Sequence, residues 1–263
     1  MSSDSLIAKK IDVERSGTRI LHGIDFRANP GEFIGVLGPS GSGKSTLLFA
    51  LSGFRPPTQG MIKYGAKGIP EDFEELKHHI GLVPQDDIVP TQLKVERVLQ
   101  YAADLRLVDM DPEQRSHRIN GVIRTLGLSE RRKLRVSKLS GGQRKRVSVG
   151  VELLTRPQYL FADEPTSGLD PALEAALMET FKKLTEDKGR VVIVTTHIMS
   201  SLELFDKVCV LCAGRLVYFG PPAQLKAYFE VDDFTKIYTQ LDKLEPQKWA
   251  AKFKSSPLST QNL

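Results

Sequence analysis

The chain has 263 residues, of which 40% are hydrophobic and 26% are charged. This composition excludes a fibrous or intrinsically disordered chain, and the length favours one domain with an inserted subdomain. The net charge of +5 is compatible with an acidic partner, either nucleic acid or an anionic membrane surface.

Short strands joined by turns are predicted for the first part of the chain. Alternating apolar positions place them over residues 6–13, 19–21, 24–28 and 33–37. We therefore expect an antiparallel sheet ahead of the first glycine-rich segment. The first five residues lack the basic and then apolar pattern of a secretory signal, which predicts a cytosolic chain.

A glycine-rich segment follows the strand that ends at residue 37. Its Gly-x-x-x-x-Gly-Lys-Ser spacing is typical of a loop that binds the phosphates of ATP or GTP. In such a loop the backbone N–H groups turn toward one anion, the lysine adds charge near the β and γ phosphates, and the serine hydroxyl binds magnesium. A helix over residues 45–51 would point its N-terminus at the phosphates. The segment consists of Gly38, Pro39, Ser40, Gly41, Ser42, Gly43, Lys44, Ser45 and Thr46.

Two further strands and a helical insertion come next. The strands are predicted over residues 60–64 and 80–83, and Gln85 follows the second one. The carboxyl ends of strands are where open α/β sheets bind ligands, so this amide can contact magnesium or an attacking water. Between residues 95 and 126 the apolar positions recur at helical spacing, with a break at Pro112.

A second glycine-rich helix start lies about a hundred residues after the first. The helix is predicted over residues 141–154, with a serine cap that makes its N-terminus another possible anion site. Basic residues crowd at positions 131–135 and 144–146, but no aromatic residues are interleaved with them, which favours a solvated face over a nucleic-acid surface. The motif consists of Ser140, Gly141, Gly142 and Gln143.

Two acids end the next strand, which is predicted over residues 159–162. Asp163 fits a magnesium ligand, and Glu164 is placed to orient and deprotonate a water, although two acids can also simply cap a turn. A helix over residues 171–186 and a strand over 190–195 follow, and His197 can then donate to a γ phosphate. Because strands alternate with helices, we expect a mostly parallel sheet with crossover helices.

The last section breaks this alternation. A hairpin is predicted over residues 208–211 and 216–219, then short helices over 224–229, 234–241 and 247–254, and a mobile tail after residue 255. Cys209 and Cys212 lie three apart on one strand, so their side chains should point to opposite faces and form neither a metal site nor a disulfide. The apolar stretches have strand length and are too short to span a bilayer.

Taken together, these motifs resemble the ATP-binding cassette (ABC) family over residues 6–241. The resemblance implies an ABC ATPase fold: a P-loop NTPase α/β core, an N-terminal antiparallel β subdomain and a helical insertion. It also implies a head-to-tail dimer, in which the signature motif of one chain reaches the ATP on the phosphate loop of the other. The implied parts are Walker A at 38–46, the Q-loop at Gln85, the signature at 139–143, Walker B with the catalytic glutamate at Asp163 and Glu164, the D-loop ending at Asp170, and the switch His197.

A narrower resemblance is to the G subfamily and its bacterial relatives with ABC-2 permeases, carried by stretches such as residues 83–87, 142–149 and 163–170. Two positions differ from the usual cassette pattern. No aromatic residue lies near position 15, so Arg15 or Val13 would contact the adenine. Lys94 stands where relatives commonly have threonine, in the region that meets the permease.

We therefore expect an ABC ATPase domain over residues 1–245, with the helical subdomain at about 90–155, and a C-terminal helix with a mobile tail or linker over 246–263. The expected ligands are ATP and Mg²⁺, with Ser45, Gln85 and Asp163 holding the metal. The expected partners are a transmembrane permease, in the same or a separate chain, and a second nucleotide-binding domain at the cytoplasmic face of the membrane. A soluble ABC ATPase acting on nucleic acid or ribosomes is the alternative, and the sequence does not identify a transported substrate.

Overall fold

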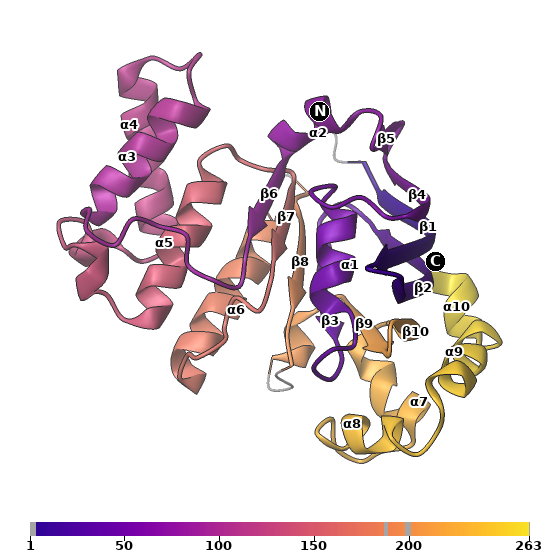
Figure 1. Ribbon diagram of the computed structural model, residues 1–263. Coiled ribbons are helices and arrows are strands. Elements are labelled where there is room, and N and C mark those ends of the chain that lie inside the picture. The colour runs from indigo at the N-terminus through magenta and orange to yellow at the C-terminus, as the bar shows by residue number, and fades with distance from the viewer. Residues whose placement is uncertain (1–3, 187–188, 198–200, 263) are drawn as a thin grey trace.

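Two sheets form the centre of the molecule. The structure is a computed structural model that describes residues 4–186, 189–197 and 201–262, so the first three residues of the segment examined for a signal lie outside it. Figure 1 shows the N-terminal strands on one side of the central sheet and a group of helices on the other side. The phosphate-binding segment lies between these two parts, where β3 ends and α1 begins.

The smaller sheet is antiparallel, as the sequence predicts. Within the described residues its strand order is β2-β1-β4-β5. Residues 19–21 and 24–28, expected as two strands, form one strand whose register with β1 shifts near Val13. Asp12 stabilises this irregularity, because its Oδ1 accepts the Gly23 N–H at 2.6 Å. The strands are β1 (Leu6–Arg15), β2 (Thr18–Ala28), β4 (Gln59–Tyr64) and β5 (Lys67–Ile69).

The larger sheet carries the strands that end in the predicted site residues. Its order is β10-β9-β3-β8-β7-β6 in the described chain, and every neighbouring pair is parallel except β9 with β10. The carboxyl ends of the parallel strands therefore meet at one edge. The strands are β3 (Phe33–Leu37), β6 (Ile80–Val83), β7 (Tyr159–Ala162), β8 (Val191–Thr195), β9 (Lys207–Cys212) and β10 (Arg215–Gly220).

The expected helical insertion is present beside β6. Figure 1 shows α3 and α4 side by side above α5. Pro112 occupies the first turn of α4, and the Asp111 carboxylate accepts the Gln114 N–H at 2.8 Å, which explains why one long periodic segment divides into two helices. The bounds of the helices before β8 are α1 (Lys44–Leu51), α2 (Phe73–Leu76), α3 (Val95–Arg106), α4 (Pro112–Thr125), α5 (Gly141–Leu153) and α6 (Pro171–Glu186).

The two cysteines lie on opposite faces of β9, as their spacing predicts. Cys209 belongs to the buried cluster under the antiparallel sheet, and Cys212 belongs to the cluster that includes the helical insertion. Both are free thiols. Burial raises the pKa of the Cys209 thiol, so this sulfur is a poor nucleophile at neutral pH.

The C-terminal section packs onto the hairpin of β9 and β10. Trp249 is buried, and its indole N–H donates to the Leu241 carbonyl at 3.2 Å. The sequence predicts a mobile tail after residue 255, whereas the structure has a helix there, with Leu258 packed against both buried clusters. No helix in the described ranges has the length and apolar character needed to cross a bilayer. The helices are α7 (Leu225–Phe229), α8 (Lys236–Leu241), α9 (Pro246–Lys254) and α10 (Pro257–Asn262).

Candidate nucleotide site

Gly38 and Gly43 shape the loop between β3 and α1. Gly43 has a φ of 99°, and a Cβ atom on it would lie 2.8 Å from the Leu21 side chain. A Cβ on Gly38 would lie 2.4 Å from the Leu211 carbonyl oxygen. These close approaches let the backbone turn tightly into the start of α1, where the free N–H groups of a helix attract an anion.

Polar groups of this loop fit a bound triphosphate. The Ser42 hydroxyl is buried and has no hydrogen-bond partner among the described residues. Lys44 is only 6% exposed, and its ammonium donates to the carbonyl oxygens of Gly38 at 2.9 Å and Pro39 at 3.2 Å. Burial lowers the pKa of Lys44, and the nearby Glu164 carboxylate opposes that shift. A buried cation held only by neutral carbonyls and one carboxylate is suited to a phosphate ligand.

Asp163 lies at the carboxyl end of β7, next to the loop. Its Oδ1 accepts hydrogen bonds from the Ser45 hydroxyl at 2.9 Å and from the Thr195 hydroxyl at 2.6 Å. The structure therefore brings together the serine and the aspartate that the sequence assigns to magnesium. Hydroxyl and carboxylate oxygens are the ligands that Mg²⁺ prefers, so this pair fits the metal.

Glu164 lies at the meeting point of three other predicted residues. Its carboxylate is 3.8 Å from the Lys44 ammonium, 3.5 Å from the Gln85 amide nitrogen and 3.6 Å from His197 Nδ1. The residue has a φ of 40°, a conformation that costs energy for a side chain with a Cβ and that is often found at functional sites. This geometry holds a carboxylate in the open edge of the sheet, where a water can reach it.

Thr195 is a site residue that the sequence analysis missed. Besides donating to Asp163, its hydroxyl oxygen accepts the Glu164 N–H at 2.8 Å. One side chain at the end of β8 thus fixes both acids at the end of β7. In the sequence, a hydroxyl residue at the end of a buried strand is only a weak indication of a site residue. The pairing of β7 with β8 is what places Thr195 beside the two acids.

The second glycine-rich motif is built as a helix start. The Ser140 hydroxyl accepts the Gln143 N–H at 3.3 Å, and the Gln143 side chain accepts the Ser140 N–H at 3.1 Å, so the two residues form a capping box. Gly142 lies against the D-loop, since a Cβ on it would be 3.2 Å from Leu169. Figure 1 shows α5 and α1 on opposite sides of β7 and β8. The fold therefore does not bring this motif to the phosphate loop of its own chain.

Two expected ligand contacts are placed differently by the structure. Asp170 accepts the N–H groups of Ala172 at 3.1 Å and Leu173 at 3.0 Å, which makes it the cap of α6 in this conformation. Val13 is buried in the core and is therefore not available to an adenine. Arg15 is the last residue of β1. Its side chain makes no hydrogen bond or ion pair with any residue in the described ranges. The contact of Arg15 with the base stays a prediction.

Tyr238, on α8, is a second residue that the sequence did not reveal. Its hydroxyl is buried beside the Gly38 N–H, at the first residue of the phosphate loop, but it makes no well-formed hydrogen bond to a described residue. Burial raises the pKa of Tyr238 to about 12, and the negative charge of Glu164 adds to this shift. The C-terminal section thus contacts the nucleotide site through a neutral hydroxyl.

We expect Tyr238→Phe to weaken ATP binding by at most the roughly 2- to 10-fold that one hydrogen bond contributes, because the loop loses a polar neighbour. Tyr228→Phe is the matched control, since its hydroxyl is also buried without a partner in the described part of the chain but lies among Tyr218, Phe229 and Trp249. Titration of a fluorescent ATP analogue measures both variants. Equal affinities would show that the Tyr238 hydroxyl has no role at the loop.

The fold and the site together define a protein that binds a nucleoside triphosphate at a P-loop on the edge of a mostly parallel sheet. Residues 21–167 match the model of the ABC transporter family. The match covers more than half of the chain, so the chain belongs to this family, whose ATP-binding domains hydrolyse ATP. The resemblance read from the motifs is confirmed.

Relatives of this chain include bacterial and plant proteins. It is 42% identical to the ABC transporter ATP-binding/permease protein Rv1747 of Mycobacterium tuberculosis, over 84% of this chain and 26% of that protein. It is 39% identical to ABC transporter G family member 26 of Arabidopsis thaliana, over 80% and 31%. The linearmycin resistance ATP-binding protein LnrL of Bacillus subtilis is 34% identical, over 78% and 66%. The match to G family members confirms the narrower resemblance, and the chain spans about a quarter to two-thirds of the length of these relatives.

The fold is also that of a solved ABC protein. The structure of cbiO1 from Clostridium perfringens, described as part of the ABC transporter complex cbiONQ, superposes with a TM-score of 0.77 and 25% identity. The superposition covers 95% of this chain and 98% of cbiO1. The expected ABC ATPase fold, with its N-terminal antiparallel sheet and helical insertion, is therefore confirmed.

Proposed function

We propose that the chain is the ATP-binding and ATP-hydrolysing part of an ABC-2 type membrane exporter, positioned at the cytoplasmic face of the membrane. The observation that carries this proposal is the convergence of Lys44, Gln85 and His197 on the Glu164 carboxylate, beside a phosphate loop of the right shape. Each of these groups matches a step that ATP hydrolysis requires. Similarity to an ATP-binding/permease protein and to G family transporters supports the coupling to transport.

In the proposed reaction Lys44 leaves the loop carbonyls and neutralises charge on the β and γ phosphates. Glu164 accepts a proton from the attacking water, and His197 donates to the γ phosphate oxygens that gain charge as the bond breaks. Ser45 and Asp163 would hold Mg²⁺, with Gln85 at its edge. When bound, the metal would offset the negative charge of the phosphates.

A second copy of the domain completes the site in this proposal. The Ser140 helix start offers N–H groups and a capped serine to an anion, yet in its own chain it lies across the sheet from α1. A head-to-tail dimer would place this helix start on the γ phosphate held by the partner. One full set of motifs in each chain is consistent with two equivalent ATP sites.

An apolar groove beside the Q-loop is our proposed docking site for the transmembrane permease. It has a volume of about 300 Å³ and lies between the segment after Gln85 and helix α3. Ile88 is 70% exposed and Leu105 is 80% exposed at its edges, which is unusual for side chains of this size. Pro84 and Ile88, on either side of Gln85 in the sequence, both line the groove, so a helix bound there would move with the residue that contacts Glu164.

We expect Leu105→Asp to reduce copurification of the transmembrane region by roughly tenfold, because a charge in the groove would be desolvated on docking. The whole transporter should lose ATPase stimulation by its permease, whereas the isolated chain should keep its basal ATPase rate. Val108→Asp is the control, since Val108 is also 69% exposed but does not line the groove. Normal copurification of the Leu105 variant would contradict this docking site.

The basic clusters support a transporter rather than a nucleic-acid-dependent ATPase. Arg132 forms an ion pair with Glu96 at 3.1 Å, and Arg144 lies 3.8 Å from Asp87. These cations are already neutralised by the protein itself, which leaves less charge for phosphate contacts. Salt-sensitive stimulation of the ATPase by DNA or RNA would instead favour the nucleic-acid alternative.

A further inference from the structure

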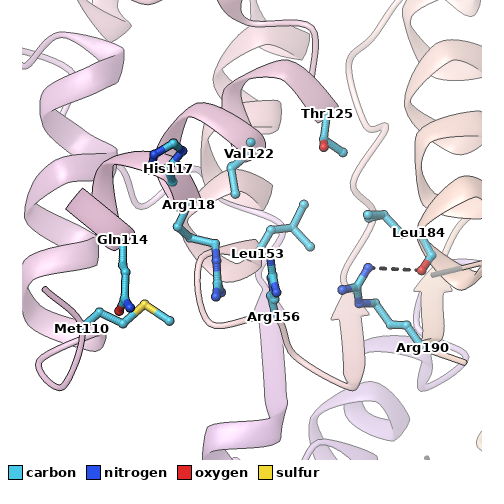
Figure 2. Close-up of a pocket in the computed structure, with 11 residues that line it drawn as sticks. Met110, Gln114, His117, Arg118, Val122, Thr125, Leu153, Arg156, Leu184 and Arg190 are labelled. Atoms are coloured by element: carbon cyan, nitrogen blue, oxygen red, sulfur yellow. Dashed lines mark hydrogen bonds between the residues drawn. The ribbon is translucent and has the colours of Figure 1, made fainter. Parts of the chain in front are cut away.

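A hollow lies on the face of the molecule where α4 meets the C-terminal ends of α5 and α6. Its volume is about 580 Å³, within the range of sites that hold small organic ligands. Val122 and Leu153 supply apolar surface, and Arg118 and Arg156 project into the same space from α4 and from the segment after α5 (Figure 2). None of these residues takes part in the nucleotide site described above.

Two arginines of this hollow have no carboxylate partner among the described residues. Neither Arg118 nor Arg156 forms an ion pair with a carboxylate in the described ranges. At the exposed rim, Glu113 lies 3.9 Å from His117. Burial lowers the pKa of Arg118, and the positive charge of Arg156 lowers it further. The two guanidinium groups therefore lie near each other, and neither is paired with a carboxylate of a described residue.

Four other arginines around the helical insertion have carboxylate partners. Carboxylates neutralise them at distances of 2.9 to 3.8 Å, so the insertion has acids available for its cations. The pairs are Arg106 with Glu152, Arg115 with Asp104, Arg132 with Glu96 and Arg144 with Asp87. Arg118 and Arg156, which line the hollow, do not form such a pair with any described residue.

Backbone contacts hold two arginines of the hollow, Arg118 and Arg190, in place. The Arg118 guanidinium donates to the Leu154 carbonyl at 2.7 Å, which uses one of its five N–H donors and leaves the others for the hollow. Arg156 has a φ of 52°, a left-handed conformation that side chains with a Cβ rarely adopt. At the far wall, Arg190 donates to the Leu184 carbonyl at 3.1 Å (Figure 2).

We propose that this hollow binds a phosphorylated small molecule, with its phosphoryl group between Arg118 and Arg156 and its carbon body against Val122 and Leu153. A planar guanidinium binds phosphate oxygens through paired N–H groups, and two of them match the charge of a phosphoryl dianion. The walls come from α4 of the insertion and from the ends of α5 and α6, so the ligand would bridge the insertion and the ATPase core.

The test uses the full chain carrying Lys44→Ala, which weakens phosphate binding at the nucleotide loop. Inorganic phosphate and adenosine monophosphate are titrated separately, and binding is followed by ³¹P NMR and calorimetry. We expect both probes to bind, and the nucleotide to bind more tightly because its carbon body contacts the apolar wall. Adding Arg156→Gln should lower both affinities by roughly tenfold.

Arg124→Gln in the same background is the matched control. Arg124, on α4, is exposed like Arg156 but does not line the hollow. Its affinities should stay within error of the parent. Arg156 makes no side-chain hydrogen bond or ion pair to any described residue, so its loss should leave the thermal unfolding midpoint unchanged. The proposal is overturned if neither probe binds at millimolar concentration, or if the Arg156 and Arg124 variants bind equally.

Discussion

Glu164→Gln is expected to lower the steady-state ATPase rate by roughly 10²- to 10⁴-fold, the usual contribution of a positioned general base. Glutamine keeps the size of the side chain and can still meet Gln85 and His197, which lie 3.5 and 3.6 Å from the carboxylate. It cannot accept the proton of the attacking water. The variant should therefore bind ATP and keep it.

Because bound ATP is then not consumed, the same variant should accumulate as an ATP-bound dimer. Mass measurement by light scattering, with ATP and with ADP, shows whether the monomer becomes a dimer only with ATP. Glu179→Gln, an exposed acid on α6, is the control and should retain the full rate. Hydrolysis by the Glu164 variant at the parent rate would contradict the role of Glu164. A nucleotide-bound monomer would instead contradict dimer formation by the isolated chain.

Lys44→Ala is expected to weaken ATP binding and, on the scale of a positioned charge at comparable sites, to lower the ATPase rate by roughly 10²- to 10³-fold. The ammonium is buried at the loop, where a charge interacts more strongly with phosphate than it would in water. Its removal also leaves the Gly38 and Pro39 carbonyls without their donor. The loop should therefore lose both a phosphate contact and part of its own support.

Calorimetric titration of ATP separates these effects from misfolding when it is combined with a thermal melt. Lys183→Ala, which removes an exposed lysine from α6, is the control and should leave both the affinity and the rate unchanged. An unchanged affinity in the Lys44 variant would remove the basis for assigning the loop to ATP. A strongly lowered melting temperature would show that Lys44 mainly supports the loop, through its bonds to the carbonyls.

Local sequence was sufficient wherever function depends on neighbouring residues. The phosphate loop, with Lys44 and Ser45 at a helix start, is one continuous segment. Its glycines indicate a backbone turn with positive φ angles, which glycine adopts readily. Asp163 and Glu164 follow a run of apolar residues whose burial in a central strand could be predicted from composition alone. The parallel sheet was predicted from the alternation of strands with helices, and the helical insertion from apolar positions at helical spacing.

Local propensity was insufficient where packing decides the outcome. The polar composition after residue 255 predicted a mobile tail, but contacts of Leu258 with the two buried clusters hold a short helix there. Such a helix is too short to be stable alone, so its stability comes from the surface against which it packs. Its sequence gives no sign of that surface.

The sequence by itself therefore determined the family of the fold, the phosphate loop and the acids that end β7. Only the tertiary structure placed Thr195 between Asp163 and Glu164, Tyr238 beside Gly38, and Arg118 opposite Arg156. The physical reason is that apolar periodicity records which face of an element is buried. It does not record which distant element covers that face, and every one of these contacts joins segments that are far apart along the chain.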